Sequence, residues 1–199
     1  MNKYNNKSSY KTALKKLLLG QFGAAMLGIM TSMPTISLSG DNRYGDLLGL
    51  ATTVLAVVFL LYIQYTAMWD IGAKDKLAID GGRMKEDIYF GAKAAVFASI
   101  PTFILTFLSI VFKSLYLITK VKVFGDIFNI SYAVDLIWNY MYHGILMIFS
   151  PGPDTVESWI SLPYLALFFF LTVPSIVFCY LAYRMGLKGK RLFPERKKD

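Results

Sequence analysis

Four apolar runs of about 23 residues dominate this chain, and they constrain its fold more than any other feature. A helix of about 20 apolar residues is long enough to cross the hydrocarbon core of a bilayer. The third run holds one charge, Lys93, one turn inside its start, where a long side chain can reach the headgroups. Since 55% of the 199 residues are hydrophobic and only 17% are charged, we predict an all-α, polytopic integral membrane protein. The predicted spans are 17–39, 47–69, 90–112 and 160–183.

The basic residues predict how these spans are oriented. Residues 1–16 carry five lysines and no acid, 70–89 carry four basic residues, and 184–199 carry seven. Cytoplasmic segments are enriched in lysine and arginine, so all three are expected on the cytoplasmic side. A fifth span at 131–149 would instead leave eleven basic residues outside and ten inside. We therefore predict two transmembrane hairpins in the cell membrane, with a basic N-terminus (1–16) and a basic tail (184–199) in the cytoplasm.

The remaining segments are read as connections of the single transmembrane domain, 17–183. Residues 70–89 are rich in charges and turn signals, which predicts a cytoplasmic loop that turns at Gly81 and Gly82. The external segment, 113–159, is long for a connection. We expect it to contain an amphipathic helix at about 133–149 that lies in the membrane interface, stopped by a Pro-Gly-Pro sequence. Whether this segment spans, re-enters or lies on the membrane stays open.

The most site-like pattern is a set of three polar residues on that predicted helix. Asp135, Asn139 and His143 stand at i, i+4 and i+8, which places them on one face. A carboxylate, an amide and an imidazole could bind a cation or relay a proton. The same spacing is also what an interfacial helix needs for its polar face. With one histidine and one cysteine in the chain, neither a metal site nor a cofactor is predicted.

The first two spans carry signals of close helix packing. Gly20, Ala24 and Gly28 recur at every fourth position, a small-residue stripe that lets another helix approach. The expected neighbour is the second span, and a homodimer contact is the alternative. Gln21 and Gln64 lie about one turn inside the cytoplasmic boundary. Because an unpaired amide is costly in lipid, we expect them to bond to each other or to backbone across the hairpin.

A short motif recurs in three of the apolar runs, in which a proline stands between serine or threonine residues. The prolines are Pro34, Pro101 and Pro174. Proline within a spanning helix bends it and frees a carbonyl group. Such positions are candidate kinks. Broken helices also line the substrate sites of some transporters, so the recurring proline motif fits either a structural or a transport role.

Three functional hypotheses follow, from different classes. Ionisable residues within spans mark ion and proton pathways, and the cores of the predicted spans contain none. The leading hypothesis is therefore a non-enzymatic accessory or anchoring component of a membrane complex. The alternative is a small oligomeric transporter or channel, and the third is a membrane enzyme that uses the Asp135/His143 face. The chain is expected to contact a bilayer with an anionic cytoplasmic leaflet. Its expected protein partner is a membrane protein, a cytoplasmic protein or a second copy of the chain, and nucleic acid is not expected.

Overall fold

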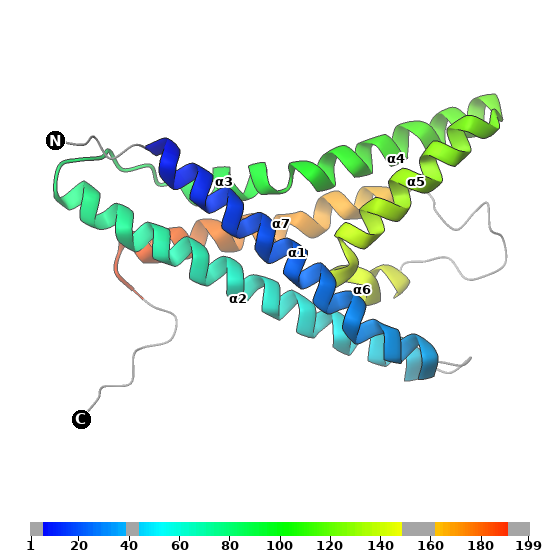
Figure 1. Ribbon diagram of the computed structural model, residues 1–199, viewed down its shortest axis with the longest axis horizontal. Coiled ribbons are helices and arrows are strands. Elements are labelled where there is room, and N and C mark those ends of the chain that lie inside the picture. Colours follow the sequence, from blue (N-terminus) through cyan, green and yellow to red (C-terminus); the bar gives the residue numbers. More distant parts are fainter. Residues whose placement is uncertain (1–5, 39–43, 149–161, 191–199) are drawn as a thin grey trace. The chain divides into compact units, whose positions relative to one another are not determined.

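The computed structural model describes residues 6–38, 44–148 and 162–190, and these residues form helices and connections without a β-strand. Figure 1 shows the helices in chain order. They are α1 (Asn6–Leu38), α2 (Tyr44–Asp80), α3 (Phe90–Ala98), α4 (Ile100–Thr119), α5 (Lys122–Trp138), the 3-10 helix η1 (Tyr140–Tyr142), α6 (His143–Ile148) and α7 (Leu162–Leu187).

Four of these helices are long and apolar enough to cross a membrane, which confirms the predicted number of spans. The candidate spans are Ser9–Met33, Leu47–Asp80, Ile100–Thr119 and Tyr164–Leu187. The chain is therefore an all-helical, membrane-embedded protein. The third span differs from its prediction, because 90–112 is not one helix: α3 ends at Ala98 and α4 begins at Ile100. Pro101, at the start of α4, has no backbone N–H to continue the helical ladder from α3.

The predicted loop at 70–89 is wrong in its first half, since α2 continues to Asp80. At about 1.5 Å per residue, its 37 residues are about 55 Å long, well beyond a hydrocarbon core of about 30 Å. The extension is helical because one face is buried: Ile71, Asp75 and Ala78 recur at helical spacing and are shielded from solvent. Only the turn that follows was predicted correctly, with Gly82 at φ +65°, a conformation that favours glycine.

The chain divides into two compact units, each with its own core. The first unit comprises Met1–Leu18, Leu61–Ala98 and Pro174–Asp199, and the second comprises Leu19–Leu60 and Ser99–Val173. The helices α1, α2 and α7 each contribute one part to each unit. The buried cluster of the first unit includes Leu17, Met68, Phe90, Cys179 and Tyr183. That of the second includes Ala24, Leu60, Met141, Leu146 and Phe168.

Glycines set the helix crossings of the first unit. A Cβ at Gly72 on α2 would collide with the carbonyl oxygen of Tyr183, and a Cβ at Gly186 on α7 would collide with that of Trp69. On α3, a Cβ at Gly91 would lie 2.5 Å from the carbonyl oxygen of Cys179. The backbone of α7 can therefore approach both α2 and α3 closely only because these positions lack side chains.

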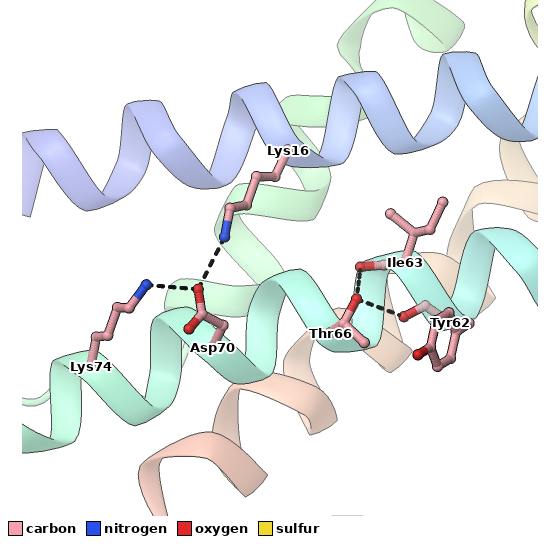
Figure 2. A network of polar contacts seen from close by, with 6 residues as sticks. All are labelled: Lys16, Tyr62, Ile63, Thr66, Asp70 and Lys74. Carbon is pink, nitrogen blue, oxygen red and sulfur yellow. Dashed lines mark hydrogen bonds and ion pairs between the residues drawn. The ribbon is translucent and has the colours of Figure 1, made fainter.

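Two aspartates of α2 tie this helix to others in the first unit. Figure 2 shows Asp70, whose Oδ2 atom accepts hydrogen bonds from Lys16 Nζ of α1 at 3.0 Å and from Lys74 Nζ at 2.9 Å. These side chains are well exposed, so each ion pair contributes at most about 1 kcal/mol. Asp75 is fully buried instead, and its Oδ2 atom accepts a hydrogen bond from the Tyr183 hydroxyl of α7 at 3.0 Å. This buried bond fixes the extension of α2 against α7.

In the second unit, the segment around η1 packs against glycines of the first two helices. A Cβ at Gly28 of α1 would lie 3.0 Å from the Met141 backbone. At Gly144 of α6, a Cβ would collide with the carbonyl group of Gly49 on α2, and the Gly144 N–H donates to Thr53 Oγ1 at 2.7 Å. The predicted helix at about 133–149 is therefore three pieces, α5, η1 and α6, and its middle piece lies against α1.

Candidate functional site

The helix α4 presents a polar stripe to the protein and an apolar surface outward. Its buried residues are Thr102, Thr106, Ser109 and Lys113, which lie on one face at helical spacing. Its exposed positions carry large apolar side chains, among them Phe107, which is 61% exposed. This is the reverse of a helix in a soluble protein and is the arrangement expected of a helix surrounded by lipid.

The next helix, α5, has the same inverted pattern, which differs from the predicted interfacial helix. Its buried face carries Phe128, Ser131 and Asp135, whereas Ile130 is 67% exposed and Ile137 is 52% exposed. An interfacial helix would turn its polar face to water. Here the polar face turns to α4, because the hydroxyl groups of α4 supply the hydrogen-bond partners that water would otherwise provide.

Figure 1 shows α4 and α5 side by side and running in opposite directions. Lys120 makes the reversal possible, since its φ of 55° ends α4 in a left-handed conformation, with its N–H bonded to the carbonyl group of Tyr116. We call the buried interface between these helices the α4–α5 seam. It consists of Thr102, Thr106, Ser109 and Lys113 on one side and Phe128, Ser131, Asp135 and Asn139 on the other.

Hydrogen bonds join the polar residues of the seam level by level. Thr106 Oγ1 donates to Asp135 Oδ2 at 2.7 Å, and Asn139 Nδ2 donates to the other carboxylate oxygen of Asp135 at 2.9 Å. At the next level the hydroxyl groups of Ser109 and Ser131 are 3.1 Å apart. Both carboxylate oxygens are thus satisfied by neutral donors, and Asp135 is fully buried without an ion pair in the described part of the chain.

Lys113 is the second ionisable residue of the seam. Its side chain is only 7% exposed, and its Nζ atom lies 5.3 Å from the centre of the Phe128 ring. Within the residues that the structure describes, no carboxylate pairs with it. The predicted third span ends at residue 112, whereas α4 continues through Lys113 to Thr119. The seam therefore buries one acidic side chain, that of Asp135, and one basic side chain, that of Lys113.

The three residues predicted to share one polar face are divided by the break at η1. Asp135 and Asn139 remain together, since the Asn139 side chain also caps α5 by donating to the Asp135 carbonyl oxygen at 3.0 Å. His143 begins α6, and its ring stacks on that of Tyr140 at 4.6 Å. Asp135 and His143 therefore have different neighbours in the structure.

The two glutamines have partners other than the predicted ones. Gln21 donates to Thr102 Oγ1 at 3.3 Å, and the Thr102 hydroxyl donates in turn to Asn139 Oδ1 at 3.3 Å. Gln21 is therefore an extension of the seam onto α1. Gln64 belongs to the first unit and donates to Ser175 Oγ of α7 at 2.5 Å. Each amide donates to a hydroxyl group on another helix, α4 for Gln21 and α7 for Gln64, and not to the other amide.

The small-residue stripe on α1 is buried along its length, at Gly20, Ala24 and Gly28. Ala24 packs in the same cluster as Ala56 of α2, the predicted neighbour. Gly28 faces the Met141 backbone instead. The stripe therefore contacts two different elements of the same chain, α2 and η1.

The three prolines differ in their setting. Pro101 stands at the break between α3 and α4, Pro174 lies inside α7, and Pro34 falls within the bounds of α1. The Pro-Gly-Pro sequence that follows α6 lies outside the described residues. Of the three prolines, only Pro101 coincides with an interruption between two helices.

Among the described residues, no group of three or more His, Cys, Asp or Glu side chains is placed to hold a metal ion. Comparison of the chain with protein-family models, curated proteins and solved structures gives no significant match.

Proposed function

We propose that the chain is a non-enzymatic accessory or anchoring component of a membrane complex, which acts through contact with another membrane protein. The observation that supports it most directly is an open apolar groove of about 510 Å³ in the second unit. It is lined by Phe103, Ile104, Phe107 and Leu108 of α4 and by Phe169 of α7. A groove without polar atoms on a lipid-facing helix fits an apolar transmembrane helix of a partner, which packs there by van der Waals contact.

The test is purification of the tagged protein in nanodiscs, followed by mass spectrometry and measurement of the native mass. We expect a second membrane protein in a fixed ratio. Phe107→Ala should reduce its recovery several-fold, whereas Ile118→Ala, at an apolar position on α4 that is 80% exposed and outside the groove, should not. A lone chain or a homo-oligomer would contradict the accessory role.

We also propose that both termini are cytoplasmic and that the membrane is the cell membrane. The support is the concentration of basic residues in 1–16, in 70–89 and in 184–199. A cysteine placed at Gly82, in a protein whose native Cys179 has been replaced by alanine, should react with a membrane-impermeant maleimide only after the cells are opened. Labelling of intact cells would reverse this orientation.

The second candidate function is a small transporter or channel, and a specific observation favours it. The α4–α5 seam buries Lys113 within a candidate span and Asp135 beside it, although the sequence alone indicated no ionisable residue in the span cores. Ionisable residues at membrane depth are expensive and commonly mark the path of an ion or a proton.

A further inference from the structure

The helix α5 lies alongside α4 for almost the whole length of a candidate membrane span. It begins three residues after α4 ends. Asn139, which follows the last residue of α5, accepts a hydrogen bond from Thr102, the third residue of the span Ile100–Thr119. The 17 residues of α5 are about 25 Å long, close to the hydrocarbon thickness of about 30 Å. With α4 crossing the membrane, α5 therefore reaches most of the way back through it.

The exposed side chains of α5 change in polarity along the helix. Its first half exposes Asp126 and Asn129 among apolar residues. From residue 130 to the end of α5 every exposed side chain is apolar, namely Ile130, Ala133, Val134 and Ile137. A helix that passes from the headgroup region into hydrocarbon requires this order. A helix that lies in the interface has the same surroundings along its whole length.

The turn that follows α5 is enclosed by protein. At η1, Met141 is 1% exposed and Tyr142 is 6% exposed, and the Met141 backbone packs on Gly28 of α1. Irregular backbone at membrane depth is tolerated only where protein or a water-filled cavity surrounds it. The break between α5 and α6 can therefore lie at membrane depth without exposing backbone groups to lipid.

The turn between α4 and α5 lies on the side of the membrane at which α2 begins. The helices α2 and α4 are consecutive candidate spans, and the nine-residue α3 between them is too short to cross. A chain that crosses twice in succession ends on the side where it started. The start of α2 and the end of α4 therefore share one side of the membrane.

The chain heads back to that same side at α6. Gly144 lies against the carbonyl group of Gly49 and donates to Thr53, close to the start of the candidate span Leu47–Asp80. Asn139 is bonded near the start of α4 and thus toward the opposite side. Between Asn139 and Gly144 the chain therefore reverses, and Figure 1 shows α6 leading back from the end of α5.

We propose that α5, η1 and α6 form a re-entrant hairpin, which enters the membrane from the side of the α4–α5 turn, reverses at η1 and returns to the same side. The hydroxyl groups of α4 satisfy the polar face of its first limb, and the glycines of α1 and α2 make room for its tip and its second limb. The hairpin adds membrane-embedded surface without a fifth crossing. It is compatible with either candidate function and with either orientation of the chain.

The first test is the sidedness of single cysteines in a Cys179→Ala background. Lys120→Cys marks the α4–α5 turn, Ile148→Cys marks the end of α6, where the native side chain is 54% exposed, and Lys85→Cys marks the exposed connection between α2 and α3. A membrane-impermeant maleimide is applied to sealed vesicles before and after they are opened. The cysteines at 120 and 148 should be labelled from the same side, and the cysteine at 85 from the other.

Two results of this labelling would overturn the proposal. A cysteine at 148 that is labelled from the same side as the one at 85 would mean that the segment crosses the membrane. A cysteine at 148 that reacts from neither side, and only after the protein is dissolved in dodecyl sulfate, would mean that α6 does not return to the surface.

The second test is depth, which separates a re-entrant hairpin from a helix that lies on the membrane. Nitroxide labels are attached to single cysteines at Val123, Ile130 and Ile137, three exposed positions along α5, in variants that elute as a single species. Their collision rates with oxygen, which concentrates in the bilayer interior, are compared with those for a water-soluble nickel complex. The ratio should be several-fold higher at Ile130 and Ile137 than at Val123, and similar to that at Phe107 of α4. Equally low ratios at all three positions of α5 would place this helix in the interface and refute the hairpin.

Discussion

Replacement of Gly144 by alanine should destabilise the second unit by about 3 kcal/mol, toward the upper end of the range for overpacking a tight contact. The added methyl group would collide with the carbonyl group of Gly49 and lie 2.6 Å from Thr53 Oγ1. The nearest neighbour is backbone and not a flexible side-chain end, so α6 must move away from α2. That movement also lengthens the hydrogen bond from the Gly144 N–H to Thr53.

The measurement is the midpoint of unfolding in increasing dodecyl sulfate, followed by circular dichroism of the protein in mixed micelles. Gly23→Ala is the matched control, since a Cβ at Gly23 of α1 meets nothing within 4 Å. Its stability should stay within about 1 kcal/mol of wild type, the size of the difference in helix propensity between the two residues. Equal midpoints for the two variants would show that α6 does not pack on α2 as described.

The second large effect is expected at the crossing of α2 and α7 in the first unit. Gly72→Ala and Gly186→Ala should each cost about 2–3 kcal/mol, because each new methyl group meets backbone atoms of the other helix. The two sites share one contact: a Cβ at Gly186 would lie 3.0 Å from Gly72 Cα. Once the first methyl group has forced the helices apart, the second costs less. The double variant should therefore be more stable than the sum predicts, by about 1 kcal/mol or more.

Cys179 provides the measurement for this comparison of the two single variants with the double variant. It is the single cysteine of the chain, and it is fully buried in the core of the first unit. Its rate of reaction with a maleimide therefore reports how often that core opens. Both single variants should react faster than wild type, while Gly23→Ala should not. Strictly additive effects, or labelling at the wild-type rate, would contradict a shared crossing at Gly72 and Gly186.

The number of membrane spans could be predicted from the sequence because it depends on a local property, the length of each apolar run. The end of α2 could not be predicted in this way. The charges of 70–80 suggest a solvated loop, although Ile71 and Ala78 carry the helical spacing that could have revealed the extension. Asp75 is bonded there to Tyr183, 108 residues away in the chain, and a contact at that separation leaves no local signal.

The candidate site, like the fold, was predicted from the sequence only in part. The spacing of Asp135 and Asn139 correctly placed them on one face, but it did not indicate whether water or another helix meets that face. The partner, Thr106, is an ordinary residue within an apolar run. A signal was present in the spacing of Thr102, Thr106, Ser109 and Lys113, which predicts a polar stripe on α4 once the run is drawn as a helix. Two stripes facing each other require the pairing of two helices, which the sequence does not specify.

The inverted pattern of α4 and α5 has a consequence for the biogenesis of the protein. An aspartate on a helix that enters lipid alone is costly, by about 2.5–3.5 kcal/mol at a helix centre on insertion scales. Without α4, Asp135 near the C-terminal end of α5 would lose the hydrogen bond from Thr106. The hydroxyl group that donates to this carboxylate, that of Thr106, belongs to α4, which is synthesised first and ends only three residues before α5 begins. The two helices are therefore suited to leave the insertion machinery as a preformed pair, with the first acting as an intramolecular chaperone for the second.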